Sequence, residues 1–160
     1  MAARKPLVMV NGRIRQLQSS DTLDAVVSEV DVISQTNGNA GAIVIGTPVY
    51  TTVADTVDKA KADAYATSEV LGLVKDASVA AGQPGMIQTD GVLTATTGQW
   101  DAITGQVGGL TTGAIYFLSP TTAGHLTSTA PSATGQLVAR VGKALSPTEL
   151  EITIEQPVEL

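Results

Sequence analysis

The sequence predicts a mainly β protein: a small β-sandwich or barrel, jelly-roll-like, with an extended N-terminal β-hairpin arm and at most one short helix. Across residues 91–154, short apolar runs alternate with Gly, Pro, Ser and Thr, at the spacing of about eight to twelve residues that is typical of sandwiches and barrels. An Asn-Gly pair near the N-terminus is the strongest short hairpin signal. Aromatic residues make up only 3% of the chain, so we expect a small aliphatic core and some apolar surface buried between subunits.

The N-terminal region is predicted to form an arm. Asn11 and Gly12 separate the runs at residues 6–10 and 13–17, and a lone hairpin is marginal in water, so this one is expected to lie on the body, a neighbouring subunit or a partner. Residues 26–33 favour a strand, with a helical turn at 23–26 as the alternative. Residues 35–41 form a loop. We therefore divide the chain into an attachment arm, residues 1–36, and a β-rich body, residues 42–160.

The body is predicted to consist of short strands in succession. Residues 56–67 contain the good helix formers and are expected to form one short surface helix or an irregular crossing. Gly72 lies inside a strand pattern and indicates a bulge or a close backbone approach. Asp90-Gly91 is a second hairpin signal, and the glycine-rich stretch around Trp100 is expected to form tight reversals. Strands are expected at residues 42–45, 48–52, 69–74, 85–89, 92–95, 113–118, 124–127, 136–142 and 149–154.

The charge of −6 is unevenly distributed over the 160 residues. Arg4, Lys5, Arg13 and Arg15 precede the first acid, Asp21. This basic segment is a solvated tail or an arm that docks on an acidic protein surface. Nucleic-acid binding is disfavoured because the run is short, lacks aromatic residues for stacking and precedes an acidic body. No apolar run suits a signal peptide or a membrane span.

The residues of catalytic and metal sites are sparse. Cysteine is absent, which excludes disulfides and thiol chemistry. The single histidine, His125, is interpreted as a surface polar residue rather than a base. Strand alternation places Glu149, Glu151 and Glu155 on one solvent face, which argues against a pair of glycosidase carboxylates. We therefore predict no enzymatic activity, no metal and no cofactor, and a carbohydrate-active enzyme remains the alternative that a substrate panel would expose.

From residue 91 onward the sequence resembles a domain of structural proteins in tailed-bacteriophage virions. The front of the body, Gly46-Thr47-Pro48-Val49-Tyr50 with Val70-Leu71-Gly72-Leu73-Val74, and the opening at residues 10–17 fit the same pattern. The motifs that carry the resemblance are Gln99-Trp100-Asp101, Thr104-Gly105, Gly109-Leu110-Thr111-x-Gly113-x-x-Tyr116-x-Leu118-Ser119, Thr122-x-Gly124-x-Leu126-Thr127, Ala130-Pro131, Gly135-Gln136 and Val141-Gly142-x-Ala144-Leu145-Ser146.

Within that group the chain looks most like capsid decoration (cement) or head-fibre proteins, with tail-fibre or tail-attached receptor-binding modules as the alternative. The resemblance implies a homotrimer on the capsid exterior, assembled in the host cytoplasm, that binds the major capsid protein and neither nucleic acid nor a membrane. We expect Trp100, Tyr116 and Phe117 to anchor the core or a subunit interface. The residues expected in the capsid-binding arm are Arg4, Lys5, Asn11, Gly12, Arg13, Ile14, Arg15 and Leu17.

Overall fold

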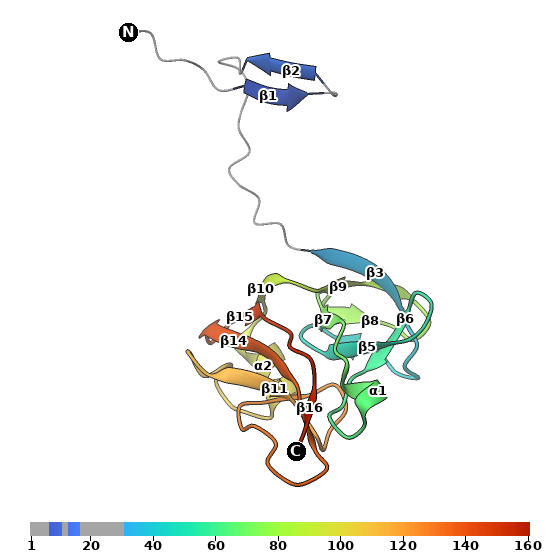
Figure 1. Cartoon of the computed structure of the whole chain (residues 1–160), viewed down its shortest axis with the longest axis vertical. Helices are drawn as coiled ribbons and strands as arrows, with labels where there is room; N and C mark the ends of the chain where they lie inside the picture. The colour runs from blue at the N-terminus through green and yellow to red at the C-terminus, as the bar shows by residue number, and fades with distance from the viewer. Residues whose placement is uncertain (1–6, 11–12, 17–30) are drawn as a thin grey trace.

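The computed structural model describes residues 7–10, 13–16 and 31–160 (Figure 1). These residues form a mainly β protein, as predicted. Figure 1 shows the barrel strands β5, β6, β7 and β9 on one side of the body and β11, β14 and β15 on the other. Within the described ranges no helix has the length and apolar character needed to cross a membrane.

The first half of the body is a closed five-stranded barrel. Its strands are β3 (Val32–Asn37), β6 (Thr56–Lys59), β5 (Pro48–Val53), β7 (Gly72–Val74) and β9 (Pro84–Gln88), in that order around the barrel. Only the β3–β6 pair is parallel. The short strands β4 (Ile43–Val44) and β8 (Ser78–Val79) pair beside it. Its core is aliphatic, as the composition predicts: Ile43, Val49, Val57, Val74, Val79 and Ile87.

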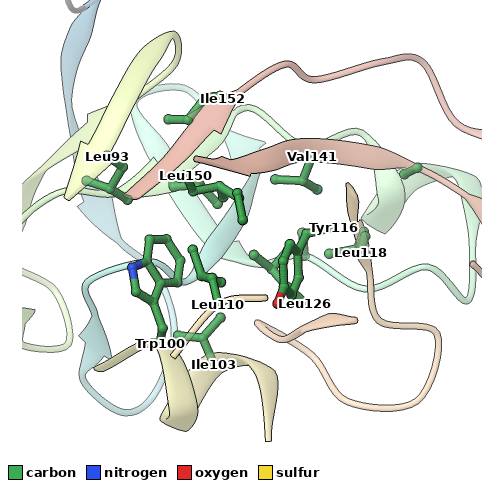
Figure 2. Close-up of a cluster of buried hydrophobic side chains, with 14 of the residues drawn as sticks. Leu93, Trp100, Ile103, Leu110, Tyr116, Leu118, Leu126, Val141, Leu150 and Ile152 are labelled. Atoms are coloured by element: carbon green, nitrogen blue, oxygen red, sulfur yellow. The ribbon is translucent and has the colours of Figure 1, made fainter. Parts of the chain in front are cut away.

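The second half is an open antiparallel sheet of five strands. The order is β10 (Gly91–Thr94), β15 (Glu149–Ile152), β14 (Arg140–Ser146), β11 (Ile115–Leu118) and β12 (Leu126–Thr127). Helix α2 (Thr97–Thr104) packs beneath this sheet, and Figure 2 shows Trp100 and Ile103 of α2 with Leu93 and Leu150 above them. The strands β13 (Leu137–Val138) and β16 (Val158–Glu159) form a separate pair.

The barrel and the open sheet share one hydrophobic cluster. Ala60, Ala62 and Leu73 belong to the barrel half, yet they lie in the same buried cluster as Trp100 and Tyr116. Because this cluster is continuous, the two halves are packed as one unit rather than as separate domains.

The predicted N-terminal hairpin is confirmed. Strands β1 (Leu7–Val10) and β2 (Arg13–Gln16) pair antiparallel, with Val10 opposite Arg13. That register leaves two residues for the turn, as a type I′ hairpin requires. Asn11 and Gly12 themselves lie outside the described residues.

Of the strand predicted at residues 26–33 of the arm, residues 26–30 lie outside the described part of the chain, and Val32 and Ile33 belong to β3 of the barrel. β3 extends to Asn37, into the loop predicted at residues 35–41. β3 pairs with β9 from Val32 opposite Gln88 to Thr36 opposite Pro84, and with β6 on its other side. β3 belongs to the barrel because it is partly apolar: its Ile33 packs against the barrel cluster. The barrel therefore begins before residue 42.

The helix predicted over residues 56–67 is wrong. Residues 56–59 form β6, which pairs with β5 through a two-residue turn, and only Tyr65–Ser68 is helical, as α1. Asp55 makes the turn possible because its φ is 54°, and Asp adopts this left-handed region more readily than most residues. With α1 and α2, the described residues hold two helices rather than at most one.

Tight reversals were predicted where helix α2 lies, because glycines punctuate the stretch around Trp100. The helix nevertheless begins with a capping box, in which Thr96 accepts from the Gln99 N–H and the Gln99 side chain accepts from the Thr96 N–H. It ends at Gly105, whose φ of 69° suits a helix C-cap. These two caps satisfy backbone groups that a short helix otherwise leaves unpaired.

The predictions made at two glycines had different outcomes. Gly72 confirms the predicted close backbone approach, because a Cβ there would lie 2.5 Å from the Gln88 carbonyl oxygen. Gly91, in contrast, does not turn a hairpin: β9 stays in the barrel while β10 pairs with β15. Its φ of 78° redirects the chain from the barrel to the open sheet.

Candidate functional site

The Gln99-Trp100-Asp101 motif builds structure. Gln99 completes the helix cap, and the Trp100 Nε1–H donates to the Thr148 carbonyl at 3.0 Å. The Asp101 carboxylate accepts from the backbone N–H groups of Gly108 at 3.2 Å and Gly109 at 2.7 Å. The motif thus fixes α2 and the loop that follows it, and its carboxylate is already engaged.

Tyr116 has a similar role. Its hydroxyl donates to the Gln106 Oε1 at 2.6 Å and accepts from the Thr111 N–H at 2.9 Å. Trp100 and Tyr116 are both fully buried, and Figure 2 shows them on either side of Leu110 and Ile103. Phe117, the third predicted anchor, is half-buried on the opposite face of the sheet.

His125 is partly buried beside the barrel. Burial lowers the pKa of the His125 imidazole below its ordinary value of 6.5, the positive charge of Lys59 lowers it further, and a hydrogen bond to the Ile103 backbone partly opposes both. A cationic neighbour does not make histidine a stronger base.

Within residues 31–160 and the two N-terminal strands, no group of three or more His, Asp or Glu side chains is placed to hold a metal.

The predicted arm residues divide into two groups. Arg13, Ile14 and Arg15 lie on β2, opposite Val10, Met9 and Val8 of β1. The other five lie outside the described residues: Arg4, Lys5, Asn11, Gly12 and Leu17.

The surface that remains is the outer face of the open sheet, the face opposite α2. One cross-strand row runs over it: Val92 is opposite Glu151, Glu151 is opposite Lys143, and Lys143 is opposite Ile115. Both apolar ends are open to solvent, with Val92 and Ile115 each 39% exposed. Leu145, on the same face, is 46% exposed. Apolar side chains therefore flank a central pair of opposite charges.

The charges on this outer face are sorted by strand. The outward charges of β14 are basic, Lys143 and Arg140, whereas those of β15 are acidic, Glu149 and Glu151. Arg140 donates to Glu155, just beyond β15, at 2.8 Å. Lys143 and Glu151 form no ion pair with any residue that the structure describes.

Half of this pattern was predictable from the sequence. The predicted acidic outer face of residues 149–154 is confirmed, because Leu150 and Ile152 are buried. The basic strand beside it was not predicted, because register shifts in β14 near Val141 and Leu145 interrupt simple alternation. Arg140 and Lys143 are three residues apart and still share a face.

No protein-family model matches the chain, and no curated protein matches it.

Proposed function

We propose that the chain is a non-enzymatic structural protein of a tailed-bacteriophage virion, a decoration protein that binds the outer surface of the major capsid shell and stabilises it. The resemblance of residues 99–146 to such proteins is the observation that carries this proposal. The structure supplies a physical reason for those residues: the Trp100, Asp101 and Tyr116 bonds fix a helix and its loop against a sheet. A cement protein needs such a rigid body and no reaction centre.

Attachment is assigned to the N-terminal arm. In this proposal the β1–β2 hairpin adds its edge to a sheet of the major capsid protein or of an adjacent subunit, so that main-chain hydrogen bonds supply β-augmentation. Arg13 and Arg15 pair with carboxylates of the shell, which makes attachment sensitive to salt. The body caps the junction, and many modest contacts act together.

The assembly state and the finer fold belong to the same proposal. The resemblance implies a homotrimer on the exterior of the capsid. A jelly-roll-like body is likewise a prediction. The strands of the body are arranged as a closed five-stranded barrel and a five-stranded sheet.

The decisive experiment is the copy number per particle, measured by quantitative mass spectrometry of purified virions against the major capsid protein. A copy number in the hundreds, in simple ratio to the shell protein, supports decoration. A copy number of a few to a few tens contradicts it and moves the protein to the tail or a fibre, the alternative role.

The arm is tested by deletion of residues 1–17. We expect the truncated protein to lose binding to shells while its circular dichroism spectrum and thermal transition stay close to those of the full chain. A matched pair of charge variants sharpens the test. R13E/R15E should weaken binding, whereas K75E, at an exposed position on the barrel, should not. Shell binding retained by the deletion would refute the arm mechanism.

A further inference from the structure

The outer face of the open sheet has a charge pattern that is complementary to itself. Across the strand order β10, β15, β14, β11, one row presents Val92, Glu151, Lys143 and Ile115. The sequence of surface types is apolar, acidic, basic, apolar. Reversing that order exchanges acid for base in the centre and leaves apolar ends in place.

A two-fold rotation performs this reversal. If the axis runs parallel to the strands, between β14 and β15 and in the plane of the outer face, it sets β14 of one copy over β15 of the other. Lys143 of each copy then faces Glu151 of the other, and Val92 faces Ile115. The strands of the two sheets stay aligned, as in the common face-to-face packing of β-sheets.

The neighbouring charges fit the same axis. Arg140 lies on the basic strand and Glu155 just beyond the acidic one, with the Glu155 N–H bonded to the Arg140 carbonyl. The rotation that pairs Lys143 with Glu151 therefore also brings Arg140 of each copy to the side of Glu155 of the other. Opposite charges therefore meet in the row of Lys143 and Glu151 and in the row of Arg140 and Glu155. These pairings favour this register over a shifted one.

We infer that the outer face of the open sheet is an isologous interface, in which two copies of this chain pack face to face about a two-fold axis. A partner of one charge sign would leave either β14 or β15 with unmatched charge, which costs binding free energy when the face is desolvated. A second copy presents both signs in the reversed order by symmetry alone. The inference concerns the free protein and does not depend on attachment to a shell.

Sedimentation velocity of the full-length protein tests the inference with two single charge reversals, K143E and E151K. In K143E a glutamate faces Glu151 of the other copy, and in E151K a lysine faces Lys143, so each variant repels itself. We expect the wild type to have twice the mass of either variant. If another surface also forms trimers, the wild type should have at least twice the mass of either variant, because each trimer then carries three such faces. K75E, on the barrel, is the control and should keep the wild-type mass.

Mixing the two variants distinguishes a lost contact from a damaged fold. In a mixed pair both facing positions hold opposite charges, so an equimolar mixture of K143E and E151K should recover the wild-type mass as a heterodimeric contact, detected by native mass spectrometry. The double variant K143E/E151K restores the pairing in every copy and should associate as the wild type does.

Two results would overturn the inference: equal masses for the wild type and both single variants, or a mixture of the variants that does not associate. Either result leaves the outer face to a different partner. Neither bears on the copy number of the protein in a virion, so this test and that of the proposed function can fail separately.

Discussion

Substituting Gly46 by alanine should disrupt the contact that joins the barrel half to α2. Gly46 has a φ of 82° and lies against the indole of Trp100. A Cβ at this position would stand 2.9 Å from Trp100 Cζ3, 3.3 Å from Cε3 and 3.4 Å from Ile103 Cγ1. The indole has little freedom to retreat, because it is fully buried and its Nε1–H is bonded to the Thr148 carbonyl.

Two physical effects add at this position. An L-residue held in the left-handed region costs about 1–2 kcal/mol, and forcing a methyl group into a packed core costs about 1–3 kcal/mol more. We therefore expect G46A to lower the free energy of unfolding by roughly 2–5 kcal/mol. Because a chain of this size loses about 2–4 °C of melting temperature per kcal/mol, the loss is easily measured.

Gly82 provides the matched control. Its φ is 71°, but a Cβ there would meet nothing within 4 Å. G82A therefore suffers the backbone strain without the steric clash, and should cost only about 1–2 kcal/mol. The difference between the two variants isolates the clash with Trp100.

Urea unfolding gives both free energies, followed by circular dichroism and by the fluorescence of Trp100, the only tryptophan. G46A should also shift the emission of the folded protein, because the added methyl group contacts the indole directly, whereas G82A should leave it unchanged. Equal losses of stability in the two variants would refute the packing of Gly46 on Trp100.

Three further predictions concern the polar contacts. T96A should lower the free energy of unfolding by about 1 kcal/mol through loss of the helix cap, and T96S should retain most of it; equal urea midpoints for T96A and the wild type would contradict the capping box. Y116F leaves Gln106 and a backbone N–H without their shared partner and should cost about 1–3 kcal/mol by the same assay, whereas an unchanged midpoint would argue against the bonds of the hydroxyl. Because the pKa of His125 is lowered in the folded protein, the unfolded chain binds a proton first as the pH falls. The stability that the neutral His125 imidazole contributes is therefore complete above about pH 6.5 and is lost on acidification. H125N should therefore show a shallower decline of stability between about pH 7 and pH 5, and parallel declines would contradict that direction.

The sequence predicted best where the signal was local. The hairpin of β1 and β2 follows from an Asn-Gly pair, and the buried Leu150 and Ile152 of β15 follow from simple alternation. Two local signals were misjudged. Ala and Lys residues suggested a helix where β6 pairs with β5 through the turn at Asp55. The glycines around Trp100 suggested chain reversals where Thr96 and Gln99 cap a helix.

Other features depend on contacts between distant parts of the chain. β10 follows β9 with only Thr89 and Asp90 between them, yet β10 pairs with β15, some 60 residues away. No local pattern distinguishes that pairing from a hairpin. The sorted charges of the outer face arise in the same way, because Lys143 and Glu151 become neighbours only when β14 pairs with β15.

The closure of the barrel through β3 also determines how the body bears mechanical load. Tension that enters the body at Asp31 acts on β3, which pairs with β9 from Val32 to Thr36 and with β6 only at Thr36 and Asn37. The Asp31 carbonyl is itself clamped by the Thr89 N–H at 2.8 Å and the Thr89 hydroxyl at 3.1 Å. From the Asp31 end β3 is first peeled from β9, but it leaves the body only when its pairing with β6 also ruptures and the barrel opens. The reinforced point is therefore the far end of β3, at Thr36 and Asn37, where force passes to β6 of the barrel wall as well as to β9 and its loop.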